Sequence, residues 1–189
     1  MDKKNALILH GTDFGKQQKQ RFNNWFPWLK TQLKKMGYEV WLPELPEAWH
    51  PDLNRYWQFL KDFDFNSKTV VIGHSSGGAM VFGLLHRLPV EKKINLAISV
   101  AGFYKDEGWD CEGLFSEPYD WEKIKKQAKK LYVIWSPTDT YISKEQTDYL
   151  ANKLKIAPTI MENKGHFNLE GGEQYKQFPE LLDIIVKNR

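Results

Sequence analysis

The segment from Thr69 to Gly78 constrains the fold of this chain most, because it combines a buried strand, a sharp turn and a helix start. The apolar, β-branched run 69–72 is typical of a strand covered on both faces. The small residues that follow let a helix begin directly against that strand. Gly73, Ser75 and Gly77 match the pattern G-x-S-x-G of a nucleophile elbow. We therefore predict a strained turn that holds the Ser75 hydroxyl clear of both elements, at the positive end of a helix.

A three-position motif also occurs by chance, so its structural context matters. The alternative is a glycine-rich turn between strand and helix that packs tightly and has no chemical role. The β-branched run before the motif and the apolar positions after it favour the elbow.

Apolar runs and helical spacings alternate along the rest of the chain. The predicted strands are residues 6–9, 38–42, 69–72, 94–101, 131–135 and 159–161. Three predicted helices span residues 23–36, 120–130 and 173–187, and Pro179 can split the last of these. Three more are predicted from their ends: one opened by Pro51 and Asp52, one that follows Ser75 and stops at Pro89, and one capped by Ser143. We predict loops at 10–15 and 102–118.

This alternation predicts an α/β fold in which helices cover both faces of a parallel sheet, a three-layer α/β/α sandwich. With 189 residues the chain is long enough for one domain, residues 1–189, with its own core. In such sheets reactive side chains collect at the carboxyl ends of the strands.

Composition narrows the class of protein. The 27 basic and 24 acidic residues are interspersed, so a net charge of +3 does not indicate a nucleic-acid partner. The single cysteine, Cys111, excludes an internal disulfide and suits a reducing compartment. We see no signal peptide and no apolar stretch long enough for a membrane span, and so expect a cytoplasmic protein.

A serine nucleophile needs a base within hydrogen-bond reach and an acid that orients the base. Among the five histidines, His166 is the best candidate base, because it follows the last predicted strand in a Gly-His loop. His10 and His74 end strands beside glycines, and we expect them to be structural. His50 and His86 have no supporting spacing.

Asp139 is the candidate acid, because it lies in the loop after the strand that precedes the histidine. The alternative is a turn aspartate that binds its own backbone, which Pro137 makes plausible. Chain order favours the catalytic interpretation: Ser75, Asp139 and His166 follow the order Ser, Asp, His of α/β-hydrolases, each after a different strand. No cluster has metal-ligand spacing, and we expect no metal dependence.

Backbone N–H groups of Thr12 and Ser76 are the candidates for an oxyanion hole, which would stabilise the charge of a tetrahedral intermediate. Several aromatic residues fall in or beside loops near the same edge of the sheet. Four of them are candidate substrate contacts: Trp25, Trp28, Phe103 and Trp109. Each could equally pack in the core.

Together these residues resemble the α/β-hydrolase superfamily and, within it, the small capless serine hydrolases of the retinoblastoma-binding-protein-9 and YdeN-like group. The resemblance extends over almost the whole chain. Its group-specific part is the Trp-x-Pro-Trp-Leu segment at 25–29, and Leu-Pro-Glu-Leu-Pro at 42–46 and Gly-His-Phe at 165–167 also match. The loop 103–118 does not line up with the pattern of the group.

The resemblance implies a six-stranded sheet in the order 2-1-3-4-5-6 without a large cap, a Ser75, His166 and Asp139 triad, and no cofactor. The leading hypothesis is a serine hydrolase that acts through an acyl-enzyme on small carboxylic esters, with a small-molecule acyl substrate as its partner. Two alternatives remain. One is an aminopeptidase or amidase that uses the same triad, and the other is a protein-interaction module on a hydrolase scaffold.

Overall fold

The computed structural model describes residues 2–13 and 19–188. In this part of the chain six strands form one sheet: β1 (Asn5–Leu9), β2 (Glu39–Trp41), β3 (Val70–His74), β4 (Ile94–Val100), β5 (Ala128–Trp135) and β6 (Thr159–Ile160). The strand order is β2-β1-β3-β4-β5-β6, and every neighbouring pair is parallel. The predicted parallel sheet and its order are confirmed.

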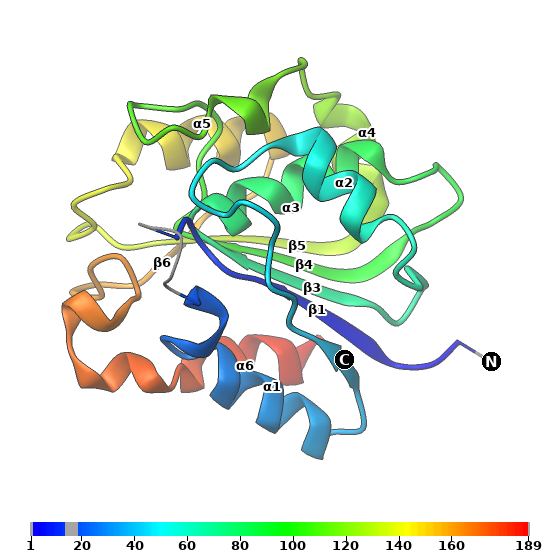
Figure 1. The fold of residues 1–189 in the computed structure, drawn as a ribbon, viewed down its shortest axis with the longest axis horizontal. Coiled ribbons are helices and arrows are strands. Elements are labelled where there is room, and N and C mark those ends of the chain that lie inside the picture. The colour runs from blue at the N-terminus through cyan, green and yellow to red at the C-terminus, as the bar shows by residue number, and fades with distance from the viewer. Residues whose placement is uncertain (1, 14–18, 189) are drawn as a thin grey trace.

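Helices cover both faces of this sheet (Figure 1). On one face lie α1 (Phe26–Lys35) and α6 (Pro179–Lys187). On the other face lie α2 (Leu53–Leu60), α3 (Ser76–Arg87), α4 (Trp121–Gln127) and α5 (Lys144–Leu154). Short 3-10 helices span Gln20–Phe22, Glu112–Phe115, Leu169–Gly171 and Glu173–Lys176. The three-layer α/β/α arrangement is therefore as predicted.

The centre of the sheet is the most deeply buried part of the molecule. Every residue of β1 and β3 is buried, because helices cover both faces of these strands. Side-chain caps begin three helices as helix chemistry requires: Asp52, Asp120 and Ser143 each accept a hydrogen bond from the backbone N–H three residues later. The predicted cap at Ser143 is thus confirmed. The carboxyl ends of the central strands lie at one edge, where the loops after β1, β3, β5 and β6 meet (Figure 1).

Several predicted boundaries were wrong. The helix predicted at 120–130 ends at Gln127, and β5 begins at Ala128, which pairs with Ile94. Here strand pairing overrides a run of lysines that suits a helix. The loop predicted at 102–118 contains the 3-10 helix Glu112–Phe115. The predicted split at Pro179 is confirmed, because a 3-10 helix spans Glu173–Lys176 and α6 begins at Pro179. Of the predicted loop 10–15, residues 14 and 15 lie outside the described residues.

Candidate active site

Ser75 lies at a strained turn between β3 and α3. Its φ of 56° and ψ of −123° are unfavourable for a residue with a side chain. The turn is held because the Ser75 N–H donates to the Val100 carbonyl at 2.9 Å, and the Ser75 carbonyl accepts from Ala79 at 2.9 Å. The backbone geometry is therefore that of the predicted elbow.

The glycines two positions before and after Ser75 have no room for a side chain. A Cβ atom on Gly73 would lie 2.0 Å from the Gly77 carbonyl oxygen. A Cβ atom on Gly77 would lie 2.4 Å from the carbonyl oxygens of Leu9 and His10. Strand and helix can thus approach this closely only with glycine at both positions.

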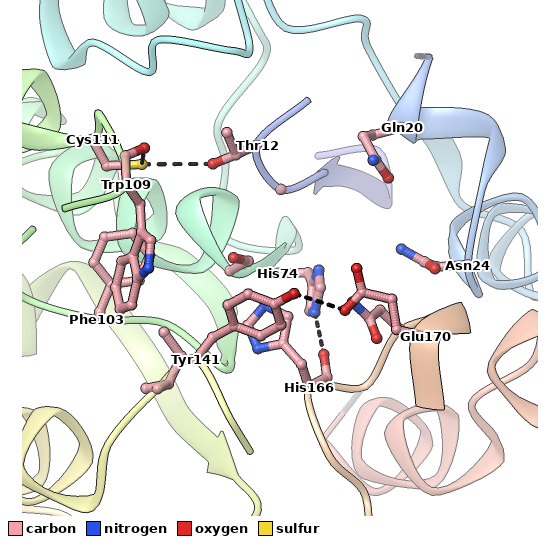
Figure 2. A pocket seen from close by; sticks show the side chains of 14 residues that line it. Thr12, Gln20, Asn24, His74, Phe103, Trp109, Cys111, Tyr141, His166 and Glu170 are labelled. Carbon is pink, nitrogen blue, oxygen red and sulfur yellow. Dashed lines mark hydrogen bonds between the residues drawn. The ribbon is translucent and has the colours of Figure 1, made fainter. Parts of the chain in front are cut away.

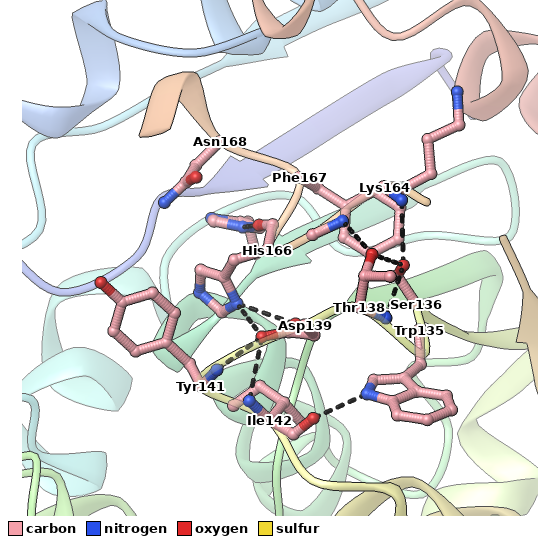
Figure 3. A network of polar contacts seen from close by, with 12 residues as sticks. Trp135, Ser136, Thr138, Asp139, Tyr141, Ile142, Lys164, His166, Phe167 and Asn168 are labelled. Atoms are coloured by element: carbon pink, nitrogen blue, oxygen red, sulfur yellow. Dashed lines mark hydrogen bonds and ion pairs between the residues drawn. The ribbon is translucent and has the colours of Figure 1, made fainter. Parts of the chain in front are cut away.

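The side chains of Asp139 and His166 form a buried pair (Figure 3). His166 Nδ1 lies 2.9 Å from Asp139 Oδ2 and 3.1 Å from Oδ1. The side chain of Asp139 is completely buried, and that of His166 is only 8% exposed. Since a carboxylate only accepts, Nδ1 is the ring nitrogen that carries the proton toward Asp139. The pairing leaves Nε2 as the nitrogen available for other contacts.

The Asp139 carboxylate also caps its own turn. Its Oδ1 accepts from the N–H groups of Tyr141 at 2.8 Å and Ile142 at 3.0 Å. The alternative interpretation of Asp139 as a turn residue is therefore correct, and it coexists with the bond to His166. These backbone donors stabilise the ionised carboxylate and fix its direction. The ring of Tyr141 also packs 4.8 Å from the imidazole of His166, centroid to centroid.

Ser75 and His166 line one cavity at the carboxyl edge of the sheet (Figure 2). Its volume is about 610 Å³ when the open solvent at its mouth is included. Among the hydrogen bonds of residues 2–13 and 19–188, none joins the Ser75 hydroxyl to His166. Such contacts are often long in ligand-free enzymes and shorten when substrate binds.

The walls of the cavity differ in polarity. Figure 2 shows Phe103 and Trp109 on one side, and Gln20, Asn24 and Glu170 on the other. The predicted contacts Phe103 and Trp109 therefore reach the cavity. Sequence reasoning missed the polar wall and Tyr141, whose hydroxyl donates to Glu170 at 3.0 Å. The one available signal was that Tyr141 and Ile142 follow Asp139 at the spacing of an Asx turn.

Trp25 and Trp28 are corrections to the predicted substrate contacts. Trp25 has no exposed surface and packs against Phe26 and Phe178. Its indole N–H donates to the Phe167 carbonyl at 3.0 Å, next to His166. Trp28 is half-buried against the core, and neither residue lines the cavity. For both, the alternative of core packing holds.

The two candidate oxyanion residues are linked by their side chains. Thr12 Oγ1 donates to Ser76 Oγ at 2.9 Å, and Thr12 also lines the cavity. Ser76 is the first residue of α3, where a backbone N–H has no acceptor within the helix. The hydroxyl contact therefore holds the loop after β1 against the start of α3.

The remaining histidines differ in their surroundings. His10 is completely buried, with Nδ1 bonded to the Gly11 carbonyl and Nε2 accepting from the Leu45 N–H. His74 is buried, and its Nε2 donates to the His166 carbonyl at 2.7 Å. His86 bonds to Glu117 and to the Asp120 N–H, outside the cavity, and His50 is exposed.

Two features of the described residues bear on metal binding and membrane insertion. Within 2–13 and 19–188, no three His, Cys, Asp or Glu side chains come together as metal ligands would. No helix in the same residues has the length and apolar character needed to cross a membrane.

The chain is similar in sequence and in structure to known proteins. The family model described as serine hydrolase matches residues 6–187. The chain is 26% identical over 187 residues to the putative hydrolase YdeN of Bacillus subtilis (strain 168), a match that covers 97% of this chain and 95% of YdeN. It is 25% identical over 167 residues to the serine hydrolase RBBP9 of Rattus norvegicus, covering 86% and 85%. The crystal structure of the ydeN gene product from B. subtilis superposes with a TM-score of 0.86 at 25% identity, covering 98% of each chain.

Proposed function

This chain belongs to the serine hydrolase family, and from that premise we propose that it hydrolyses small carboxylic esters through an acyl-enzyme formed on Ser75. The observation that carries the proposal is the Asp139–His166 pair, joined at 2.9 Å, whose histidine lines the same cavity as Ser75. A buried carboxylate bonded to Nδ1 fixes the tautomer and leaves Nε2 to act as a base.

In the proposed reaction the Ser75 hydroxyl attacks the ester carbonyl while His166 Nε2 takes its proton. Asp139 stabilises the imidazolium that forms. The negative charge that develops on the carbonyl oxygen is stabilised by the N–H groups of Ser76 and Thr12. His166 then returns the proton to the alcohol that leaves. Water, activated by the same imidazole, attacks the acyl-enzyme, releases the acid and regenerates the Ser75 hydroxyl.

The cavity supports a small substrate. Its apolar wall of Phe103, Trp109 and Ile142 suits a short acyl chain or a compact alcohol. The opposite wall presents amide and carboxylate groups, which suit a polar substituent at the other end of the molecule. Long-chain lipids are poorer candidates, because polar side chains line part of the same small space.

Hydrolysis of aminoacyl amides by the same three residues is the second candidate. Glu170 favours it, since this carboxylate lines the cavity and would pair with a substrate ammonium group. A protein-interaction module without activity is not favoured by any feature of the site, because a scaffold has no use for a buried Asp139–His166 pair in a cavity.

A substrate panel tests the proposal. Wild-type protein and Ser75→Ala are assayed with 4-nitrophenyl esters of two to eight acyl carbons and with aminoacyl 4-nitroanilides. We expect turnover of the shortest esters, a burst of nitrophenol equal to the enzyme concentration, and loss of both in Ser75→Ala. Faster turnover of the anilides would replace the first candidate by the second. A folded wild-type protein that turns over neither class would overturn both.

A further inference from the structure

Several side chains from distant parts of the chain bond to the segment that carries His166. We call residues 164–169 the His166 loop. Ser136 and Thr138 accept from the N–H groups of Lys164 and Gly165, each at 3.0 Å. On the other side of His166, Trp25 donates to the Phe167 carbonyl and Asn24 accepts from the Leu169 N–H at 2.9 Å. The position of the imidazole therefore depends on several separate contacts.

A further contact, from His74, reaches the backbone of His166 itself. His74 Nε2 lies 2.7 Å from the His166 carbonyl oxygen, and the two rings are 4.9 Å apart, centroid to centroid (Figure 2). Since a carbonyl oxygen only accepts, Nε2 of His74 must carry the hydrogen. Burial lowers the pKa of His74 to about 3, so its ring is neutral near pH 7. His74 is thus a neutral donor with one fixed tautomer.

His74 is also the residue directly before Ser75, at the end of β3. The strand places the His74 ring and the Ser75 turn together, so a shift of one moves the other. The bond from His74 is therefore a direct link between the strand of the nucleophile and the backbone of the base.

We propose that His74 is a positioning residue, whose Nε2–H holds the His166 carbonyl so that the imidazole stays within reach of Ser75. This inference rests on the proposed function of Ser75 and His166. Displacing a catalytic group by about 1 Å can lower a rate about 100-fold. Losing this bond should therefore lower kcat more than substrate affinity, since the cavity walls that bind substrate are left in place.

His10 provides a matched comparison within the same protein. It is completely buried beside a glycine and bonded through both ring nitrogens, as a structural histidine would be. Its partners are the Gly11 carbonyl and the Leu45 N–H, and neither belongs to the His166 loop. If His74 served only to fill the core, substitutions at the two positions would have similar consequences.

Glutamine and asparagine separate the two possibilities at position 74. The amide nitrogen of glutamine occupies a position similar to Nε2, whereas that of asparagine corresponds to Nδ1 and falls short of the carbonyl. For 4-nitrophenyl acetate we expect His74→Asn to lose roughly 10- to 100-fold in kcat with KM within about threefold. We expect His74→Gln to recover to within about fivefold of wild type, and His10→Gln to stay within about threefold. His74→Leu replaces the Asn variant if the latter does not fold.

A spectroscopic measurement makes the test independent of turnover. The Nδ1 proton of His166, bonded to Asp139, gives a downfield proton NMR signal that is identified by its loss in His166→Ala. The signal should shift or broaden in His74→Asn and return in His74→Gln. An unchanged signal together with wild-type kcat in folded His74→Asn would overturn the inference and leave the proposed function standing. An equal loss in His10→Gln would overturn it too. If wild-type protein hydrolyses no ester or anilide, the proposed function fails first.

Discussion

The elbow that carries Ser75 and the His166 loop that carries its proposed base face the same cavity, but different parts of the sequence hold them in place. The elbow is marked by a short motif, in which Gly73 and Gly77 leave no room for a side chain. Its distant contacts are with backbone atoms, the carbonyls of Val100, Leu9 and His10. The His166 loop relies on hydrogen bonds from positions as far away as Trp25 and His74. The proposed nucleophile thus lies in a recognisable sequence motif, whereas the proposed base is held by side chains scattered along the chain.

This difference determines how the elbow and the His166 loop should respond to substitution. In the elbow, backbone atoms crowd one another and cannot give way. In the His166 loop, each contact is a single hydrogen bond to a side chain, and the others remain when one is lost. We therefore expect changes in the elbow to be severe and changes around the loop to be graded.

The largest effect should come from removing the nucleophile. Ser75→Ala should lower kcat for 4-nitrophenyl acetate by about 10⁴- to 10⁶-fold, because no other group forms the acyl-enzyme. The fold should be unaffected, as the substitution removes only a hydroxyl at the turn. Steady-state kinetics and the melting temperature measure the two quantities, with the exposed Ser67→Ala as control. A Ser75→Ala variant with more than a tenth of wild-type kcat would refute the proposed role.

Replacing the proposed acid Asp139, which bonds to His166, should matter almost as much. Asp139→Asn should lower kcat by about 10⁴-fold, since an amide can hold Nδ1 in the wrong tautomer and does not stabilise an imidazolium. The same assay tests this. If activity in Asp139→Asn equals that of wild type, another carboxylate orients His166.

Alanine substitution of one glycine in the elbow and one in the His166 loop compares how tightly the two regions are packed. Gly73→Ala places a Cβ atom 2.0 Å from a carbonyl oxygen, and we expect it to cost more than about 4 kcal/mol of unfolding free energy. Gly165→Ala meets no atom within 4 Å but keeps a φ of +53°, so we expect a cost of about 1 kcal/mol. Urea denaturation measures both, or soluble yield where Gly73→Ala does not fold. Equal costs would mean that the elbow is no tighter than the His166 loop.

The pH dependence of stability should reveal the lowered pKa of His74 in the folded protein. Its pKa is lowered from 6.5 to about 3 in the folded protein. Below pH 6.5 the unfolded chain therefore binds a proton that the folded chain does not, and stability falls as the pH falls toward 3. Between pH 6.5 and 4.5 this amounts to about 2 kcal/mol. His74→Gln should lose about that much less than wild type over this range in urea denaturation. Parallel curves would show that His74 titrates alike in both states.

A single contact of the His166 loop should have the smallest effect. Thr138→Val keeps the shape of the side chain but removes the oxygen that accepts from the Gly165 N–H. We expect a loss of about 1 kcal/mol in stability and a several-fold decrease in kcat, because the other contacts of the loop remain. A decrease as large as that of Asp139→Asn would mean that this one bond controls the loop.

The same difference explains how much could be predicted from the sequence. The elbow was found because its residues are adjacent and of recognisable type. The places of Asp139 and His166 after successive strands, together with chain order, predict that the two side chains come together, and their bond at 2.9 Å confirms that contact.

The supports of the His166 loop could not be predicted, since no pattern links residues that far apart. Trp25 illustrates this: its aromatic character suggested a substrate contact, but which face of a helix meets the core depends on tertiary packing. His74 was predicted to be structural, yet its contact with the His166 carbonyl is visible only in three dimensions. At Ala128, pairing with β4 decides between helix and strand, and the local sequence does not contain that information.

The central claim is that the elbow and the His166 loop come together so that His166 activates Ser75. The most direct measurement is reaction of the folded protein with a fluorophosphonate probe, followed by digestion and mass-spectrometric location of the adduct. We predict one adduct, on Ser75, which forms far more slowly in His166→Ala. No adduct on folded wild-type protein, an adduct on another residue, or equal labelling of His166→Ala would contradict the account.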